Sequence, residues 1–83
     1  MTIFEHDVET RLRGLRRDLI KSARRPRLLE SEERELAEID AALLRIAEGR
    51  FGVCEGCGRA LGRQRLLADP TAVLCLSCLQ GPR

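Results

Sequence analysis

Four cysteines are the residues of this chain whose type and spacing predict a definite chemistry. Cys54, Cys57, Cys75 and Cys78 stand as C-x2-C-x17-C-x2-C in the last third of the sequence. Each C-x2-C pair puts two thiolates on one tight turn, and the doubled spacing is typical of a tetrahedral site for one zinc ion. Because the protein fills all the ligand positions and leaves none for water, we expect the zinc to hold structure and not to catalyse a reaction.

Other uses of paired cysteines agree less well with the sequence. Two disulfides would require export, but the chain opens Met-Thr-Ile-Phe-Glu-His-Asp without the features of an export signal, so we expect a cytoplasmic protein with reduced thiols. A redox C-x2-C lies at a helix start in a βαβ unit, a pattern that the sequence lacks. An iron–sulfur cluster also takes four cysteines, although two matched pairs favour a structural ion. Gly56 and Gly58 flank Cys57, where a tight turn needs positive φ and bare N–H groups.

Two helices are expected to precede and position the cysteines, at about residues 5–24 and 27–48. Each has a single apolar stripe at helical spacing. The stripes consist of Val8, Leu12, Leu15 and Leu19, and of Leu29, Leu36, Ile39, Leu43 and Ile46, with Glu32 as the one interruption. Pro26 prevents one helix from continuing into the next and suits a first helical position, while Gly49 suits a left-handed helix stop.

The charges of the two helices are of opposite sign. Residues 7–27 carry eight Lys or Arg and three acids, whereas residues 28–48 carry seven acids and two Arg. Two such helices joined by a short break favour an antiparallel, coiled-coil-like hairpin, with residues 1–50 as the hairpin and residues 51–83 as a small zinc-finger globule. A single continuous helix through Pro26 is the alternative, and it would expose both stripes and require dimerisation.

Composition excludes several classes of function. The net charge is +2, and Phe4 and Phe51 are the only aromatic residues, so neither a global basic field nor a base-stacking surface is expected. No apolar run approaches the ~20 residues that span a bilayer. The sequence shows no nucleophile with a neighbouring base and no phosphate-binding loop, and His6 is far from the cysteines, so we expect no enzyme activity.

A family resemblance joins these features. Residues 42–54 read ALLRIAEGRFGVC and end on Cys54 of the first cysteine pair. Residues 65–72 read RLLADPTA and shortly precede Cys75 of the second pair. This combination, over about residues 36–80, closely resembles the DksA/TraR family of C4-type zinc finger proteins. The resemblance implies a bacterial protein whose zinc globule anchors a helical hairpin. It also implies a partner, since relatives enter the secondary channel of RNA polymerase and alter initiation, often together with ppGpp, without sequence-specific contact to promoter DNA.

The chain departs from the family pattern at the predicted hairpin turn. Full-length members carry an acidic Asp-x-x-Asp-x-Ala tip, whereas residues 22–27 read SARRPR. We therefore take Arg24, Arg25 and Arg27 as candidate partner-binding residues, with a solvated charge cluster as the alternative. The arms are also short, at about 30 Å, and Gly81 and Pro82 do not support the further helix common in relatives.

The sequence thus predicts a mainly α protein that binds one zinc ion and modulates transcription through RNA polymerase, with ppGpp acting only jointly with polymerase. A nucleic-acid-binding zinc ribbon and a structural adaptor that has lost polymerase modulation are the alternatives. We expect Arg59, Arg63 and Arg65 to offset the negative charge of the zinc site. The residues expected to form the small core beneath the zinc are Phe51, Leu61, Leu66, Val73 and Leu74.

Overall fold

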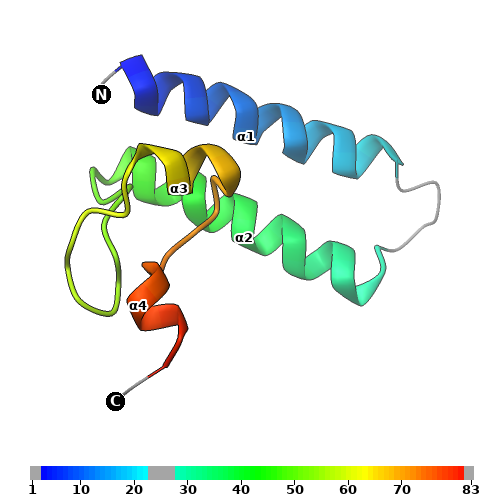
Figure 1. Ribbon diagram of the computed structural model, residues 1–83. Coiled ribbons are helices and arrows are strands. Elements are labelled where there is room, and N and C mark those ends of the chain that lie inside the picture. The colour runs from blue at the N-terminus through cyan, green and yellow to red at the C-terminus, as the bar shows by residue number, and fades with distance from the viewer. Residues whose placement is uncertain (1–2, 23–27, 82–83) are drawn as a thin grey trace.

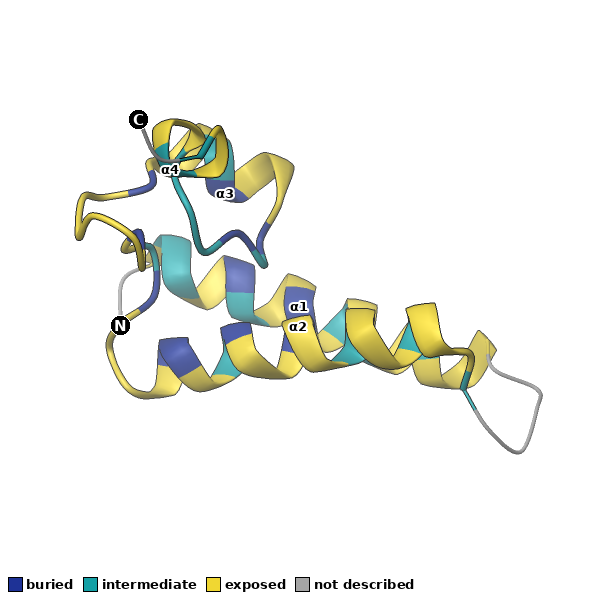
Figure 2. Ribbon diagram, turned by 90° about the horizontal axis from the view of Figure 1, so that it is seen from below, coloured by how far each residue is buried: buried dark blue, intermediate teal, exposed yellow. Residues whose placement is uncertain are grey.

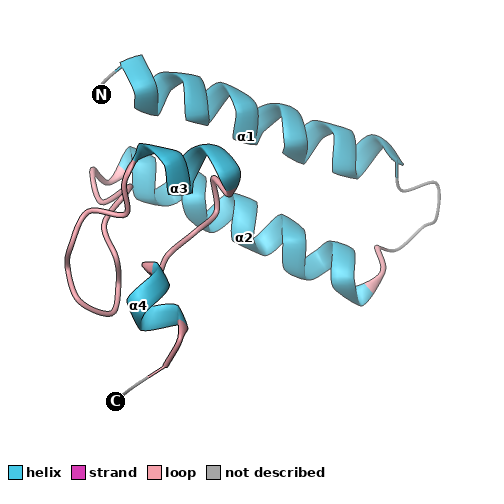
Figure 3. Cartoon of the chain, viewed as in Figure 1, coloured by secondary structure: helices cyan, strands magenta, loops and turns pink. Residues whose placement is uncertain are grey.

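The chain folds into two long helices followed by a small globule with two short helices (Figures 1 and 3). The computed structural model describes residues 3–22 and 28–81. The helices are α1 (Ile3–Ser22), α2 (Glu30–Ala47), α3 (Arg63–Ala68) and α4 (Leu76–Leu79). Within these described ranges the only β pairing is an isolated antiparallel bridge between Val53 and Ala60. The predicted mainly α fold class is confirmed.

The two long helices form an antiparallel hairpin, as predicted. They run side by side in opposite directions, and Figure 1 shows the globule packed at the end where α1 starts and α2 finishes. Between them Arg16 Nε lies 2.7 Å from Asp40 Oδ1, which pairs the basic helix with the acidic one. The alternative of one continuous helix is therefore wrong.

The helix ends differ from the sequence expectation by a few residues. We expected α2 to start near residue 27, but it starts at Glu30, because the Glu32 side chain accepts a hydrogen bond of 2.8 Å from the Leu29 backbone N–H. This contact satisfies one of the free N–H groups at the helix start. At the other end Gly49 has φ 75°, and the N–H of Arg50 donates to the Arg45 carbonyl at 2.8 Å, the pattern of a Schellman stop. Pro26 lies outside the described residues.

The core lies at the base of the hairpin, where the globule covers it. Its buried members are Val8, Leu12, Ile39, Ala42, Ile46, Phe51, Cys54, Leu61, Leu66 and Ala72. The apolar stripes predicted for the two helices are only partly buried, since Leu15 is 40% exposed and Leu29 is 54% exposed. Figure 2 shows the same gradient, with buried residues near the globule and mostly exposed ones toward the turn. The distal half of the hairpin therefore relies on few buried contacts.

The globule is tied to α1 as well as to α2. Arg11 Nη1 donates to the Leu67 carbonyl of α3 at 2.7 Å, and the Arg63 guanidinium lies 4.7 Å from the centre of the Phe4 ring. Of the expected globule core, three residues are buried, while Val73 and Leu74 are half-buried. In the part of the chain that the structure describes, no helix combines the length and apolar character of a membrane span.

Candidate metal centre

The first cysteine pair lies in a turn between α2 and α3. The Gly58 N–H donates to the Cys54 carbonyl at 2.9 Å, and the Cys54 N–H donates to the Arg59 carbonyl at 2.8 Å, which closes the loop around Cys57. Gly58 has φ 77°, as expected for this position, because only glycine adopts this region without steric cost. The turn leaves Cys54 buried and Cys57 exposed.

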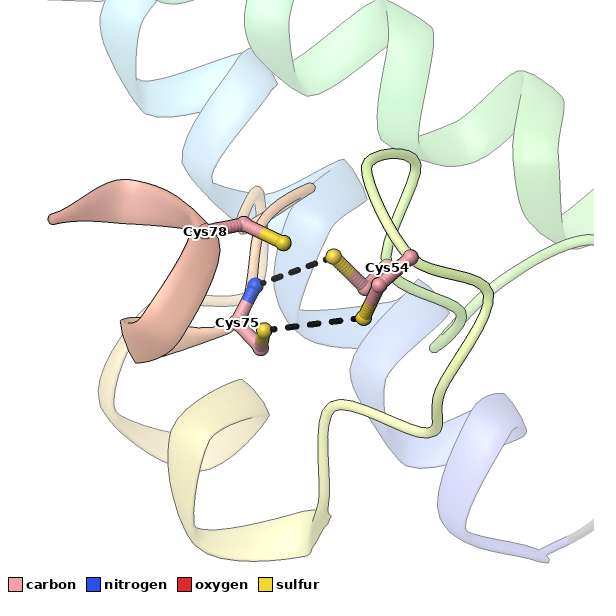
Figure 4. A group of neighbouring side chains, drawn as sticks. Cys54, Cys75 and Cys78 are labelled. Atoms are coloured by element: carbon pink, nitrogen blue, oxygen red, sulfur yellow. Dashed lines mark hydrogen bonds between the residues drawn. The ribbon is translucent and has the colours of Figure 1, made fainter. Parts of the chain in front are cut away.

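The second pair lies on a single helical turn. Cys75 is the residue that precedes α4 and Cys78 lies inside it, with the Leu79 N–H donating to the Cys75 carbonyl at 2.9 Å. This turn places both sulfur atoms on the side that faces the first pair. Figure 4 shows the sulfur atoms of Cys54, Cys75 and Cys78 turned toward one another from the two segments.

The four sulfur atoms have the spacing that a tetrahedral ion requires. All four Sγ atoms lie within 4.8 Å of one another, and Cys57 Sγ lies 3.8 Å from Cys75 Sγ. A zinc ion with sulfur at about 2.3 Å would set the sulfurs about 3.8 Å apart. The four cysteines are therefore positioned to bind one structural Zn²⁺, as the sequence predicts.

Backbone N–H groups prepare Cys54 to bind as a thiolate. The Cys75 N–H lies 3.3 Å from Cys54 Sγ, and the Gly56 N–H lies 3.4 Å from it. These donors, Cys75 foremost, outweigh burial and lower the pKa of Cys54 to about 6. The pKa of Cys75 is also lowered, chiefly by the backbone N–H of Cys78. Two of the sulfurs are thus held in surroundings that favour negative charge.

The pKa of Cys78 is raised instead of lowered, and a bound cation would lower it. Hydrogen bonding to Cys54 and then to Cys75, with burial, raises the pKa of Cys78 to about 12. Several thiolates this close together repel, so one sulfur retains its proton unless positive charge lies between them. A divalent ion supplies that charge and allows all four sulfurs to bind as thiolates.

Gly56 has no side chain, which allows the two cysteine segments to approach each other. A Cβ atom at this position would lie 3.0 Å from Cys78 Sγ and 3.3 Å from Cys78 Cβ, which is tighter than ordinary contact. The positive φ predicted for Gly56 is wrong, because Gly56 is not among the glycines with positive φ in the described chain. The close approach of the two cysteine segments is what excludes a side chain.

The other residues singled out from the sequence lie around this centre or apart from it. Arg65 Nε donates to the Leu74 carbonyl at 3.1 Å and so braces the segment that leads to Cys75. Arg63 lies against Phe4, and Arg59 is exposed. His6 is exposed on α1 and is not part of the sulfur group. Arg24, Arg25 and Arg27 lie outside the described residues.

Sequence reasoning missed Arg45, a buried cation between α2 and the globule. Arg45 is 7% exposed, and its Nη2 atom has no hydrogen-bond partner among the described residues. It lines a cavity of about 270 Å³ together with Arg65, Glu38 and Asp69. No pattern in the sequence marks it, because burial arises only when the globule folds back over this face of α2.

Comparison with known proteins gives consistent matches to one group. The profile of the prokaryotic dksA/traR C4-type zinc finger matches residues 49–82. The RNA polymerase-binding transcription factor DksA of Escherichia coli (strain K12) is 39% identical over 49 residues, which are 59% of this chain and 32% of that protein. The chain thus spans about a third of the length of the curated relatives it matches.

Solved structures match over most of the chain. The RNA polymerase binding protein and transcriptional regulator Dks from Chlamydia trachomatis superposes with a TM-score of 0.79 at 27% identity, over 96% of this chain and 88% of that one. The transcription factor DksA2 from Pseudomonas aeruginosa superposes with a TM-score of 0.60 at 33% identity, over 92% of this chain and 71% of that one. The likeness therefore includes the hairpin as well as the globule.

Proposed function

Because the chain belongs to the DksA/TraR family of C4-type zinc finger proteins, we propose that it binds bacterial RNA polymerase through its helical hairpin and modulates transcription. The observation that carries this proposal is an antiparallel hairpin mounted on a four-cysteine globule, an architecture shared over 96% of the chain with a polymerase-binding regulator. Such a protein acts in the cytoplasm and reads no promoter sequence itself.

The dimensions of the hairpin support binding within the secondary channel of polymerase. α1 has 20 residues, or about 30 Å at ~1.5 Å each, and the described chain measures 42 × 33 × 21 Å. A slender arm on a stiff base can enter a pore that excludes a compact domain of equal mass. Arg24, Arg25 and Arg27 would then lie at the leading turn, and we propose them as contacts to an acidic surface.

Cys54, Cys57, Cys75 and Cys78 are the proposed zinc ligands, and their role is structural. Four protein sulfurs complete a tetrahedral shell, so no coordination position is left for a substrate or an activated water. We accordingly propose a regulator without enzyme activity. The division into a hairpin at residues 1–50 and a globule at residues 51–83 belongs to the same proposal, with the globule as the base and the hairpin as the arm.

Joint action with ppGpp is a narrower part of the proposal, and the cavity at Arg45 is its most suitable place. The unpaired Nη2 of Arg45 could donate to a phosphate oxygen, and Arg65 lines the same cavity. Glu38 and Asp69 also line it and would repel a polyanion. Binding of ppGpp should therefore need cationic groups from polymerase, which agrees with joint action and not with binding to the chain alone.

Site-specific crosslinking with purified polymerase tests the main proposal. A photoreactive amino acid at Ser22, next to the turn, should crosslink to the subunits that line the channel, whereas the same group at the exposed Gln64 of α3 is the control. Replacing Arg24, Arg25 and Arg27 together with glutamate should weaken binding at least 10-fold, since several charge pairs change sign.

Two other outcomes would assign a different function. Tight, salt-sensitive binding to bare duplex DNA without polymerase would favour the nucleic-acid-binding ribbon, because neutralised phosphates make affinity fall steeply with salt. Absence of polymerase binding in a zinc-loaded, folded protein would favour the structural adaptor. The ligand assignment is tested separately, since Cys54→Ser should remove the bound zinc and Ser77→Ala, in the same segment as the second pair, should not.

A further inference from the structure

The distal part of α1 carries a basic hollow. Arg13, Arg16, Arg17, Ile20 and Lys21 line this open depression of about 380 Å³. Ile20 is 43% exposed, so the hollow has an apolar floor between cationic side chains. Among the described residues, Arg13 pairs with the half-buried Glu9 at 3.1 Å and Arg17 pairs with the exposed Asp18 at 3.7 Å, both on the same helix. Both arginines are exposed, and ion pairs of this kind exchange readily for others.

The distal part of α2 carries a hollow of the opposite sign. Leu28, Glu33, Leu36, Ala37 and Asp40 line this depression of about 500 Å³. Leu28 and Leu36 are half-buried, and so they offer apolar surface beside the two carboxylates. No cationic side chain lines this hollow among the described residues.

Both hollows lie on one face of the hairpin. Arg16 from the first hollow and Asp40 from the second approach to 2.7 Å, so the two depressions meet across the helix pair. The globule covers a different face of α2, the one marked by Glu38, Ala41 and Arg45, which are spaced three and four residues apart. The ten residues of the two hollows, here called the distal face, are therefore free of the globule.

We propose that the distal face binds a second copy of this chain. A symmetric dimer requires a surface that is complementary to itself, and this face carries a basic half and an acidic half side by side. A twofold axis parallel to the helices lays α1 of each protomer on α2 of the other, with both turns pointing the same way. The basic half then meets the acidic half twice, and Ile20 meets the apolar surface around Leu36.

The size of the face indicates a weak, reversible dimer. α2 has 18 residues, or about 27 Å, and two helices side by side are about 20 Å wide, so each protomer would cover roughly 500 Å². The total of roughly 1,000 Å² is near the lower limit for a specific interface. We expect dissociation constants between about 1 μM and about 1 mM, with weakening at high salt because the charges are exposed. The inference does not depend on polymerase binding.

Charge-swap variants of the full zinc-loaded chain test the proposal by sedimentation velocity. The acidic variant, Arg13→Glu with Arg17→Glu, cancels the positive charge of the basic half, and the basic variant, Glu33→Lys with Ala37→Lys, turns the acidic half net positive; the Arg16–Asp40 pair stays intact in each. Each variant alone should lose at least 10-fold in self-association. Mixed in equal amounts, the two should form a dimer, since the introduced glutamates of one variant then face the introduced lysines of the other, and the unchanged acidic half of the first faces the unchanged basic half of the second.

Matched controls make the outcome decisive. Arg34→Glu with Arg59→Glu changes the net charge as the acidic variant does, but off the distal face, and it should dimerise like the parent chain. The proposal is overturned if the parent chain stays monomeric up to about 1 mM, if the off-face control dissociates equally, or if the folded variants fail to associate when mixed. A monomeric parent that binds a DNA duplex or polymerase through Arg13 and Arg17 would assign the face to that partner instead.

Discussion

At the residue scale, the sulfur cluster depends on the two segments approaching without a side chain between them. Gly56 lies where an added Cβ would meet Cys78 Sγ at 3.0 Å and the Leu74 side chain at 3.4 Å. Gly58, two residues later, has φ 77° and nothing within 4 Å of an added Cβ. The two glycines of the knuckle therefore serve different physical needs, one for space and one for backbone conformation.

We expect Gly56→Ala to weaken zinc binding by about 10-fold to 100-fold, because Cys78 must shift to admit the methyl group. Gly58→Ala is the control, since it strains the backbone by about 1 kcal/mol but does not crowd a sulfur atom. Competition with a chromogenic chelator measures both affinities. Equal zinc affinity in the two variants would show that space at Gly56 does not limit the site.

Acidification should release the zinc and destabilise the fold together. The pKa of Cys54 is lowered to about 6 in the fold, against about 8.5 for a free cysteine. A lowered pKa contributes stability that is complete above the unfolded value and lost as pH falls through the folded value. We expect the melting temperature to be highest above about pH 8.5 and to fall steeply below about pH 6, with zinc release over the same range. A melting temperature unchanged between these limits would contradict this assignment.

Sequence alone could identify the four cysteines but not the groups around them. The C-x2-C spacing predicts which sulfurs lie on one turn, since that geometry is local. The donation from the Cys75 N–H to Cys54 Sγ at 3.3 Å and the space at Gly56 both arise between segments about 20 residues apart. Contacts of this kind have no periodic signal, and for the same reason the burial of Arg45 was not predicted.

At the element scale, glycine position decides where the long helices stop and how well they form. Gly49 has φ 75° at the end of α2, and the Arg50 N–H that follows it donates to the Arg45 carbonyl. Gly14 lies inside α1 with ordinary helical backbone, and an added Cβ there would lie 3.7 Å from Arg17 Nη2. The same change to alanine should therefore have opposite effects at the two sites.

Gly49→Ala should lower the free energy of unfolding by about 1 kcal/mol, because alanine is strained in the left-handed region. Gly14→Ala should raise it by about 0.5–1 kcal/mol, because alanine loses less entropy inside a helix. Urea denaturation of the zinc-loaded variants measures both. A gain in stability from Gly49→Ala would mean that the Schellman stop does not form in solution.

The helices themselves were predictable because their signals are local. The apolar spacing and Gly49 indicated two antiparallel helices, and both form. The start of α2 was placed too early because Pro26 was taken as the start signal. In the structure Leu29 is the residue before the helix, and its N–H donates to the side chain of Glu32. The exposure of Leu15 and Leu29 was also missed, since the sequence pattern shows which residues share a stripe but not how far a neighbour covers it.

At the scale of the whole molecule, hairpin and globule share one core. Five of its buried members come from α1 and α2 and five from the segment that follows them. Arg11 and Phe4 of α1 contact α3 directly, through the Leu67 carbonyl and Arg63. The distal half of the hairpin adds few buried side chains. Neither part therefore buries enough apolar surface to be stable without the other.

Chelation of the zinc should consequently unfold more than the globule. Structural zinc is worth on the order of 10–16 kcal/mol, as much as the whole stability of a small domain. α3 and α4 supply only 6 and 4 helical residues, against 20 and 18 in α1 and α2. If the hairpin were stable alone, EDTA would remove only that small share of the circular dichroism at 222 nm. We expect a much larger loss, because Val8, Leu12 and Ile39 lose their cover when the globule melts, and we expect added zinc to reverse it.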